Sequence, residues 1–89
     1  MPTSQSVDET LSDRSKTHGS FADNAFYAQE MRTLFRQGHV GLTLVQREAL
    51  DMIAGKISRI LSGNPNEPDH WLDIEGYARL ARNDLESTK

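Results

Sequence analysis

The sequence predicts an all-α protein: a three-helix antiparallel bundle that is completed by oligomerisation and preceded by a disordered N-terminal tail. In three segments, apolar residues recur at three- and four-residue spacing, which is typical of amphipathic helices. No segment alternates with a period of two, so we expect no strand. Short loops join the three segments and favour an up-down-up arrangement. A chain of 89 residues has a thin core, so we expect a homo-oligomer to bury the remaining apolar faces.

Residues 1–13 are polar and are expected to form a disordered acidic tail ahead of a helical domain at residues 14–89. The tail contains Asp8, Glu9 and Asp13 and no base, so it accounts for the whole formal net charge of −3. The domain is therefore neutral, which argues against binding to duplex nucleic acid but allows a local basic site for a small anion.

The first helix is expected from Ser20 to Gln37. Ser20 followed by Asp23 resembles a capping box, and Gly38 is a natural stop. The apolar side of this helix is formed by Phe21, Ala25, Ala28, Met31, Leu34 and Phe35.

The second helix is expected to start at Thr43, with Gln46 as its capping partner, and to run to Ser62 before Gly63. Its apolar positions are Val45, Ala49, Ile53, Ile57 and Ile60.

The third helix is expected to begin between Asn66 and Asp69 and to end near Glu86, with proline in the first turn. Its apolar positions are Trp71, Ile74, Ala78, Ala81 and Leu85.

A candidate anion site lies beside the apolar side of the second helix. Lys56 and Arg59 are three residues apart, so both heads can converge on one phosphate. Gly55 costs the helix roughly 1 kcal/mol relative to alanine, and one gain from it is room for a ligand. In the competing interpretation Gly55 serves close helix packing, Lys56 extends along the apolar surface and Arg59 pairs with Glu48 or with a neighbouring helix.

Four chemically active side chains gather at the start of the third helix. His70, Asp73 and Tyr77 share one side of it, so His70 and Asp73 could bind the edge of a base. Trp71 or Tyr77 could stack on a base, worth about 1–3 kcal/mol. The alternative is that the rings belong to the core and that the imidazole has an internal partner.

Arg14 and His18 precede the first helix, whose free N–H groups favour anions. Gly19 would allow close approach of the backbone. This segment is interpreted either as an arm that binds phosphate or as a solvated basic linker.

The stretches THGSFADNA, REALDMIAGKISRILSG and DHWLDIEGYARLA resemble a group of small phage and prophage proteins of unknown function. More remotely the chain is similar to the MazG-like all-α nucleoside triphosphate pyrophosphohydrolases. That resemblance implies a magnesium site with carboxylates on two helices, matched here by Glu48 and Asp51 and by Asp69 and Asp73. The second pair departs from the spacing of that superfamily, so the resemblance supports a nucleotide-associated fold more than catalysis.

Three functions follow from these features. The favoured one is a phage-encoded protein that binds a nucleotide or cyclic nucleotide immune signal without cleaving it, in the cytoplasm of an infected bacterium and without a cofactor. The second is a Mg²⁺-dependent pyrophosphohydrolase using the four carboxylates. The third is a helical protein–protein adaptor. No stretch is long and apolar enough to span a membrane, so no membrane partner is expected.

Overall fold

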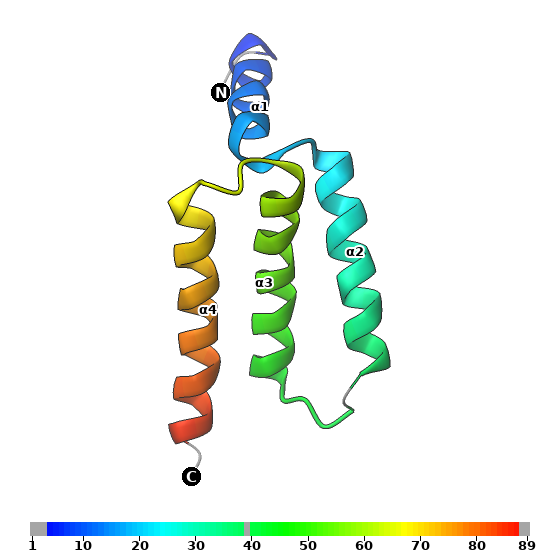
Figure 1. Ribbon diagram of the computed structural model, residues 1–89, viewed down its shortest axis with the longest axis vertical. Coiled ribbons are helices and arrows are strands. Elements are labelled where there is room, and N and C mark those ends of the chain that lie inside the picture. The colour runs from blue at the N-terminus through cyan, green and yellow to red at the C-terminus, as the bar shows by residue number, and fades with distance from the viewer. Residues whose placement is uncertain (1–3, 39, 88–89) are drawn as a thin grey trace.

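Four helices are formed within residues 4–38 and 40–87, the part of the chain that the computed structural model describes, with side chains described from Thr10 onward. They are α1 (Ser4–His18), α2 (Phe21–Gln37), α3 (Leu44–Ser62) and α4 (Pro68–Ser87). Within these residues there is no strand (Figure 1). The expected all-α class is confirmed.

Local signals place the ends of α2, α3 and α4 where the sequence predicted them. The side chain of Ser20 accepts a hydrogen bond from the backbone N–H of Asp23 (3.1 Å) at the start of α2. Thr43 and Gln46 form the reciprocal capping box of α3, with bonds of 3.0 and 2.9 Å. Pro68 is the first residue of α4, where its missing N–H costs nothing.

The structure differs from the expectation at the N-terminus. α1 runs from Ser4 to His18, through most of the expected tail and the whole basic arm. The prediction rested on the absence of apolar periodicity, yet Ser4–His18 also contains no glycine or proline to interrupt a helix. Residues 1–3 lie outside the described residues. Arg14 and His18 are therefore placed on the last turns of a helix.

α2, α3 and α4 form a single layer with α3 in the middle, and not a bundle around a shared core. On α3, Ser58 bonds to α2, whereas Lys56 meets α4. Positions two residues apart are about 200° apart around a helix axis, so α2 and α4 lie on opposite sides of α3. In the described chain no Cα of α2 comes within 8 Å of a Cα of α4. Neighbouring helices in the layer are antiparallel, as expected (Figure 1).

The monomer has a small core because each face of a single layer is open. The buried apolar side chains in the described part are Ala28, Ala49 and Ala54. Ser58 and His70 are the buried polar ones. Many large apolar side chains stay exposed, including Trp71 at 55%.

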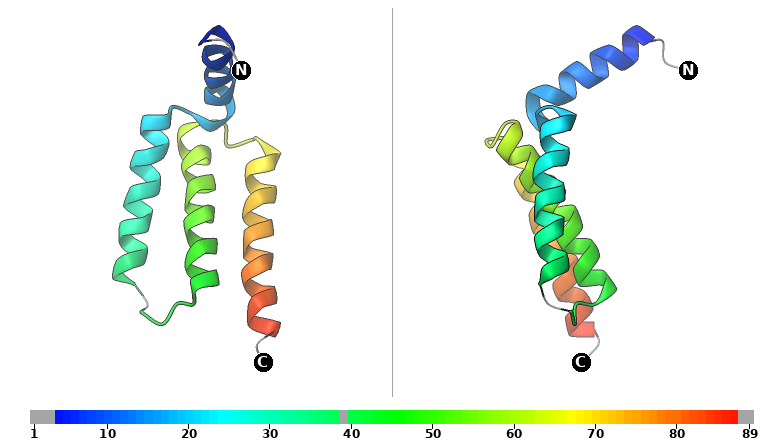
Figure 2. Two further views of the ribbon diagram at one scale, coloured as in Figure 1. Left: turned by 180° about the vertical axis from the view of Figure 1, so that it is seen from behind. Right: turned by 90° about the vertical axis from the view of Figure 1, so that its right-hand side faces the viewer.

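α1 leaves the layer at one end and projects to one side of it (Figure 2). It contacts both α2 and α3. The corner between α1 and the layer, termed the elbow, contains the candidate site.

Candidate functional site

Two glycines make the elbow possible because backbone meets backbone there. Gly19 turns the chain from α1 into α2 with a φ of +77°, a value that favours glycine. A Cβ at Gly19 would overlap the carbonyl of Ser62, and a Cβ at Gly63 would overlap the carbonyl of Thr17. The N–H of Asn64 donates to the same Thr17 carbonyl (3.0 Å). The loop after α3 is thereby fixed against the end of α1.

Asn24 holds the elbow together from the first turn of α2. Its amide oxygen accepts hydrogen bonds from the hydroxyls of Ser58 and Ser62, each at 3.1 Å. Its amide nitrogen donates to the carbonyls of His18 and Ser20. One side chain therefore connects α2, α3 and the end of α1.

His70 supports the elbow from α4 and is buried, with 2% exposed. Its Nε2 lies 2.8 Å from the carbonyl of Thr17, which can only accept, so Nε2 carries the proton. Its ring meets that of His18 edge to face, with centroids 5.1 Å apart. The hydrogen bond to Thr17 agrees with the alternative interpretation from the sequence, in which the imidazole of His70 has a partner inside the protein. His70 positions the end of α1.

The elbow encloses a pocket of about 650 Å³, called the elbow pocket. This volume is in the range of small-molecule sites. It is lined by Leu11, Arg14, Ser15, His18, Gly19, Phe21, Asn24, Ala25, Ala28, Gln29, Arg32, Gly55, Ser58 and Arg59. Three arginines and a histidine are in this set, and no carboxylate from the described residues joins them. The lining therefore favours an anion.

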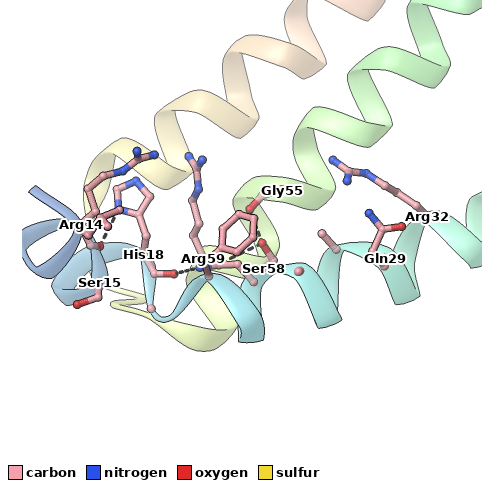
Figure 3. Close-up of a pocket in the computed structure, with 14 residues that line it drawn as sticks. Arg14, Ser15, His18, Gln29, Arg32, Gly55, Ser58 and Arg59 are labelled. Carbon is pink, nitrogen blue, oxygen red and sulfur yellow. Dashed lines mark hydrogen bonds between the residues drawn. The ribbon is translucent and has the colours of Figure 1, made fainter. Parts of the chain in front are cut away.

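Arg14, His18 and Arg59 come from two helices and extend in the same direction in Figure 3. The guanidinium groups of Arg14 and Arg59 make no ion pair or hydrogen bond with the rest of the described structure. Arg59 acts on Asp73 through its charge alone, so the N–H donors of both guanidinium groups are available to a ligand.

His18 is kept neutral at the edge of these cations. Burial lowers its pKa below the ordinary 6.5, and the positive charge of Arg59 adds to that effect. Its Nδ1 lies 3.1 Å from the carbonyl of Arg14, a bond that raises the pKa and opposes the shift. An anion next to the ring would remove the repulsion and favour the imidazolium.

Arg32 joins the pocket from α2 and is already partly engaged. Its Nη2 donates to the carbonyl of Asp51 (3.2 Å), and its Nε lies 3.9 Å from the carboxylate of the same residue. That Nε is buried and has no hydrogen-bond acceptor among the described residues. The carboxylate of Asp51 offsets part of the charge of Arg32, so Arg14 and Arg59 are the stronger candidates for an anion.

Lys56 is paired within the protein and does not line the elbow pocket. Its ammonium lies 2.9 Å from the carboxylate of Asp73, at the junction of α3 and α4. This bond is the largest cause that lowers the pKa of Asp73. Arg59 lies about 60° from Lys56 around α3. It lines the elbow pocket, and its charge also acts on Asp73.

Trp71 and Tyr77 do not line the elbow pocket. Trp71 donates from its indole nitrogen to the carbonyl of Pro65 (2.8 Å) and is otherwise half exposed. Tyr77 is partly buried further along α4. The aromatic ring at the pocket is Phe21, with 88% exposed.

The four carboxylates of the magnesium alternative come from α3 and α4 and do not gather at one place. Asp51 faces Arg32 of α2, whereas Asp73 faces Lys56 at the other side of α3. Glu48 and Asp69 are exposed. No group of three or more metal-binding side chains is formed by the residues whose positions are described.

The structure thus brings Arg14, His18 and Arg59 together, with His70 directly behind them, and leaves Trp71, Tyr77 and the Lys56–Asp73 pair elsewhere. Sequence reasoning missed Asn24, Phe21 and Arg32. Asn24 carried a signal, since a polar residue interrupts the apolar side of α2 one turn before Ala28.

Gly55 opens onto the elbow pocket, and a Cβ added to it would meet no heavy atom of a neighbouring described element within 4 Å. Close helix packing therefore does not explain this glycine, and room for a ligand remains. Gly76 is equally uncrowded by the described residues, but it lies outside the pocket lining.

Comparisons with protein-family models, with curated proteins and with solved structures found no match for this chain. The resemblances drawn from the sequence stay predictions. No described helix is both long enough and apolar enough to cross a membrane.

Proposed function

We propose that this protein binds a nucleotide or cyclic nucleotide through its phosphates in the elbow pocket and holds it without cleaving it. The observation that carries the proposal is the lining of that pocket, with Arg14, His18, Arg32 and Arg59 and no carboxylate among the described residues. An arginine guanidinium can donate two parallel hydrogen bonds to two oxygens of one phosphate, and each charge-assisted hydrogen bond contributes about 1.5–3 kcal/mol.

The remaining lining fits the rest of a nucleotide. Phe21, exposed at the start of α2, offers a ring face on which a base can stack. Ser15 and Gln29 add hydroxyl and amide groups that can bond a sugar or a base edge.

Binding without cleavage is favoured over magnesium-dependent hydrolysis because the carboxylates needed to hold Mg²⁺ are not grouped at the pocket among the described residues. The resemblance to phage proteins supports a role in the cytoplasm of an infected bacterium, where such a protein would sequester a nucleotide immune signal as a homo-oligomer.

Thermal melts with ATP, AMP, pyrophosphate and cyclic di- and trinucleotides, each with EDTA or with Mg²⁺, test the proposal. We expect at least one nucleotide to raise the Tm in EDTA and to be recovered intact by chromatography. Ligand consumed only with Mg²⁺ would support hydrolysis instead, and no response to any nucleotide would contradict the proposal.

The residues are tested by Arg14→Ala combined with Arg59→Ala. Losing one charge-assisted bond from each side chain weakens binding by about 3 kcal/mol or more, which is over 100-fold. The matched control is Arg79→Ala combined with Arg82→Ala, which removes the same charge from exposed ion pairs of α4. The control should bind as the wild type does; equal loss in both variants would refute a local site.

A further inference from the structure

The layer has a face opposite the elbow pocket, and α3 shows what that face is made of. Gly55 and Arg59 line the pocket. Residues two positions away on a helix are about 200° around it, so Ile53, Ile57 and Leu61 point to the other side of the layer. They recur at four-residue spacing and form an uninterrupted apolar strip.

The same step of two residues continues this face over α2. Ala25 and Gln29 line the pocket, so Tyr27 between them points away from it. Leu34 lies two residues after Arg32 and also points away, with 65% exposed.

α4 completes the face. The charge of Arg59 acts on Asp73, which places that carboxylate on the pocket side of α4. Trp71, two residues earlier, is therefore on the other side. The name apolar face is used below for Tyr27, Leu34, Ile53, Ile57, Leu61 and Trp71.

We propose that a second copy of this chain covers the apolar face, so that two layers pack into one dimer with a shared core. This identifies the surface through which the homo-oligomer of the proposed function forms, but it does not require the elbow pocket to bind a ligand. α1 projects from the opposite side of the layer and leaves the face open (Figure 2).

Three features favour a second copy over another protein. The buried apolar side chains of the described monomer are three alanines, so every molecule needs this face covered in order to have a core. The strip on α3, at the centre of the face, carries no charge, and the nearest acids on the same side of α2 are Asp23 and Glu30, one turn before Tyr27 and Leu34. Two copies can therefore meet along α3 without like-charge repulsion. A copy of the same chain is present wherever the protein is made, and a two-fold interface uses the same patch twice.

The area is sufficient. A helix rises about 1.5 Å per residue, so α3 with its 19 residues gives the face a length of about 28 Å. Three helices spaced about 8–10 Å apart give a width of about 25–30 Å. The face therefore measures about 700–840 Å², close to the roughly 800 Å² per partner of a stable interface.

Analytical ultracentrifugation of the full chain tests the interface. The wild type should sediment at twice the monomer mass, and Leu34→Glu combined with Leu61→Glu should shift it to monomer. The control, Leu72→Glu combined with Leu80→Glu, adds the same charge at side chains each 61% exposed, away from the apolar face. It should stay dimeric. A monomeric wild type, or equal dissociation in the control, would overturn the proposal.

The single tryptophan gives a second readout that does not depend on a variant folding well. Trp71 is 55% exposed in the monomer. In the wild-type dimer its emission should be blue-shifted and poorly quenched by acrylamide, and dilution to the monomer should reverse both. Full quenching at concentrations where the protein sediments as a dimer would place the interface elsewhere. A dimer that binds no nucleotide would contradict the proposed function and leave this interface intact.

Discussion

Asn24→Ala should destabilise the elbow, and the loss should be measurable in the protein without a ligand. Asn24 makes four side-chain hydrogen bonds, two accepted from serines of α3 and two donated to backbone carbonyls. Each is worth about 0.5–1.5 kcal/mol net. The partners keep other bonds: the hydroxyls of Ser58 and Ser62 still donate to carbonyls at 2.6 and 2.7 Å. Each hydroxyl has one proton, which it shares between Asn24 and that carbonyl, so the two serine bonds are weak and neither hydroxyl is left unsatisfied. The sum therefore lies at its low end, about 2 kcal/mol.

Urea unfolding at one fixed protein concentration, followed by circular dichroism, measures this loss. In a thermal melt of the same variant, a loss of about 2 kcal/mol corresponds to a fall in Tm of about 8–16 °C for a domain of this size. Asn83→Ala, at an exposed position of α4, is the control and should stay within about 0.5 kcal/mol of the wild type. A change below about 0.5 kcal/mol for Asn24→Ala would refute the assignment of this side chain as the connection between three helices.

Two further predictions concern the glycines and the imidazole. Gly63→Ala should lower the Tm strongly, because the added Cβ would overlap the Thr17 carbonyl. Gly76→Ala should raise the stability by up to about 1 kcal/mol, since the described chain leaves room for the added Cβ and alanine favours a helix. The opposite order in thermal melts would contradict the packing at the elbow. Nucleotide affinity should rise as pH falls below about 6.5, because the pKa of His18 is lowered in the free protein and a phosphate would raise it, so that binding takes up a proton. Titration calorimetry at about pH 5.5 and about pH 7.5, on either side of the ordinary histidine pKa, should show this rise in affinity for the wild type and a smaller rise for His18→Gln. Equal pH dependence of the affinity in both proteins would exclude His18 as the group that takes up the proton.

Helix ends were predictable from the sequence because caps are local. Ser20, Thr43 and Gly63 act within one turn of the residues they satisfy, so spacing alone identifies them. α1 was missed because its structure does not depend on an apolar side. The single layer was missed because apolar periodicity tells which side of a helix is buried and does not tell how many neighbours bury it.

The candidate site was predictable where the signal was chemical and unpredictable where it depended on long-range contacts. The cations Arg14 and Arg59 stood out by type and position. Asn24 gave only one sequence signal, the break in the apolar side of α2, and that signal does not identify its role because its partners are 34 and 38 residues away. Lys56 was assigned to the anion site because it lies near Arg59 in sequence, and the carboxylate of Asp73 that binds it could not be located without the fold.

Backbone amide spectra of the ¹⁵N-labelled protein, recorded during titration with cyclic di-AMP or ATP in EDTA, test the central claim most directly. Glycine amides report position here, since Gly19 and Gly55 line the elbow pocket whereas Gly38 and Gly76 do not. We predict saturable shifts of the first two with little change in the others. Shifts confined to Gly76, or no saturable shift at Gly19 and Gly55 with a nucleotide that binds, would contradict the assignment of the elbow pocket as the phosphate site.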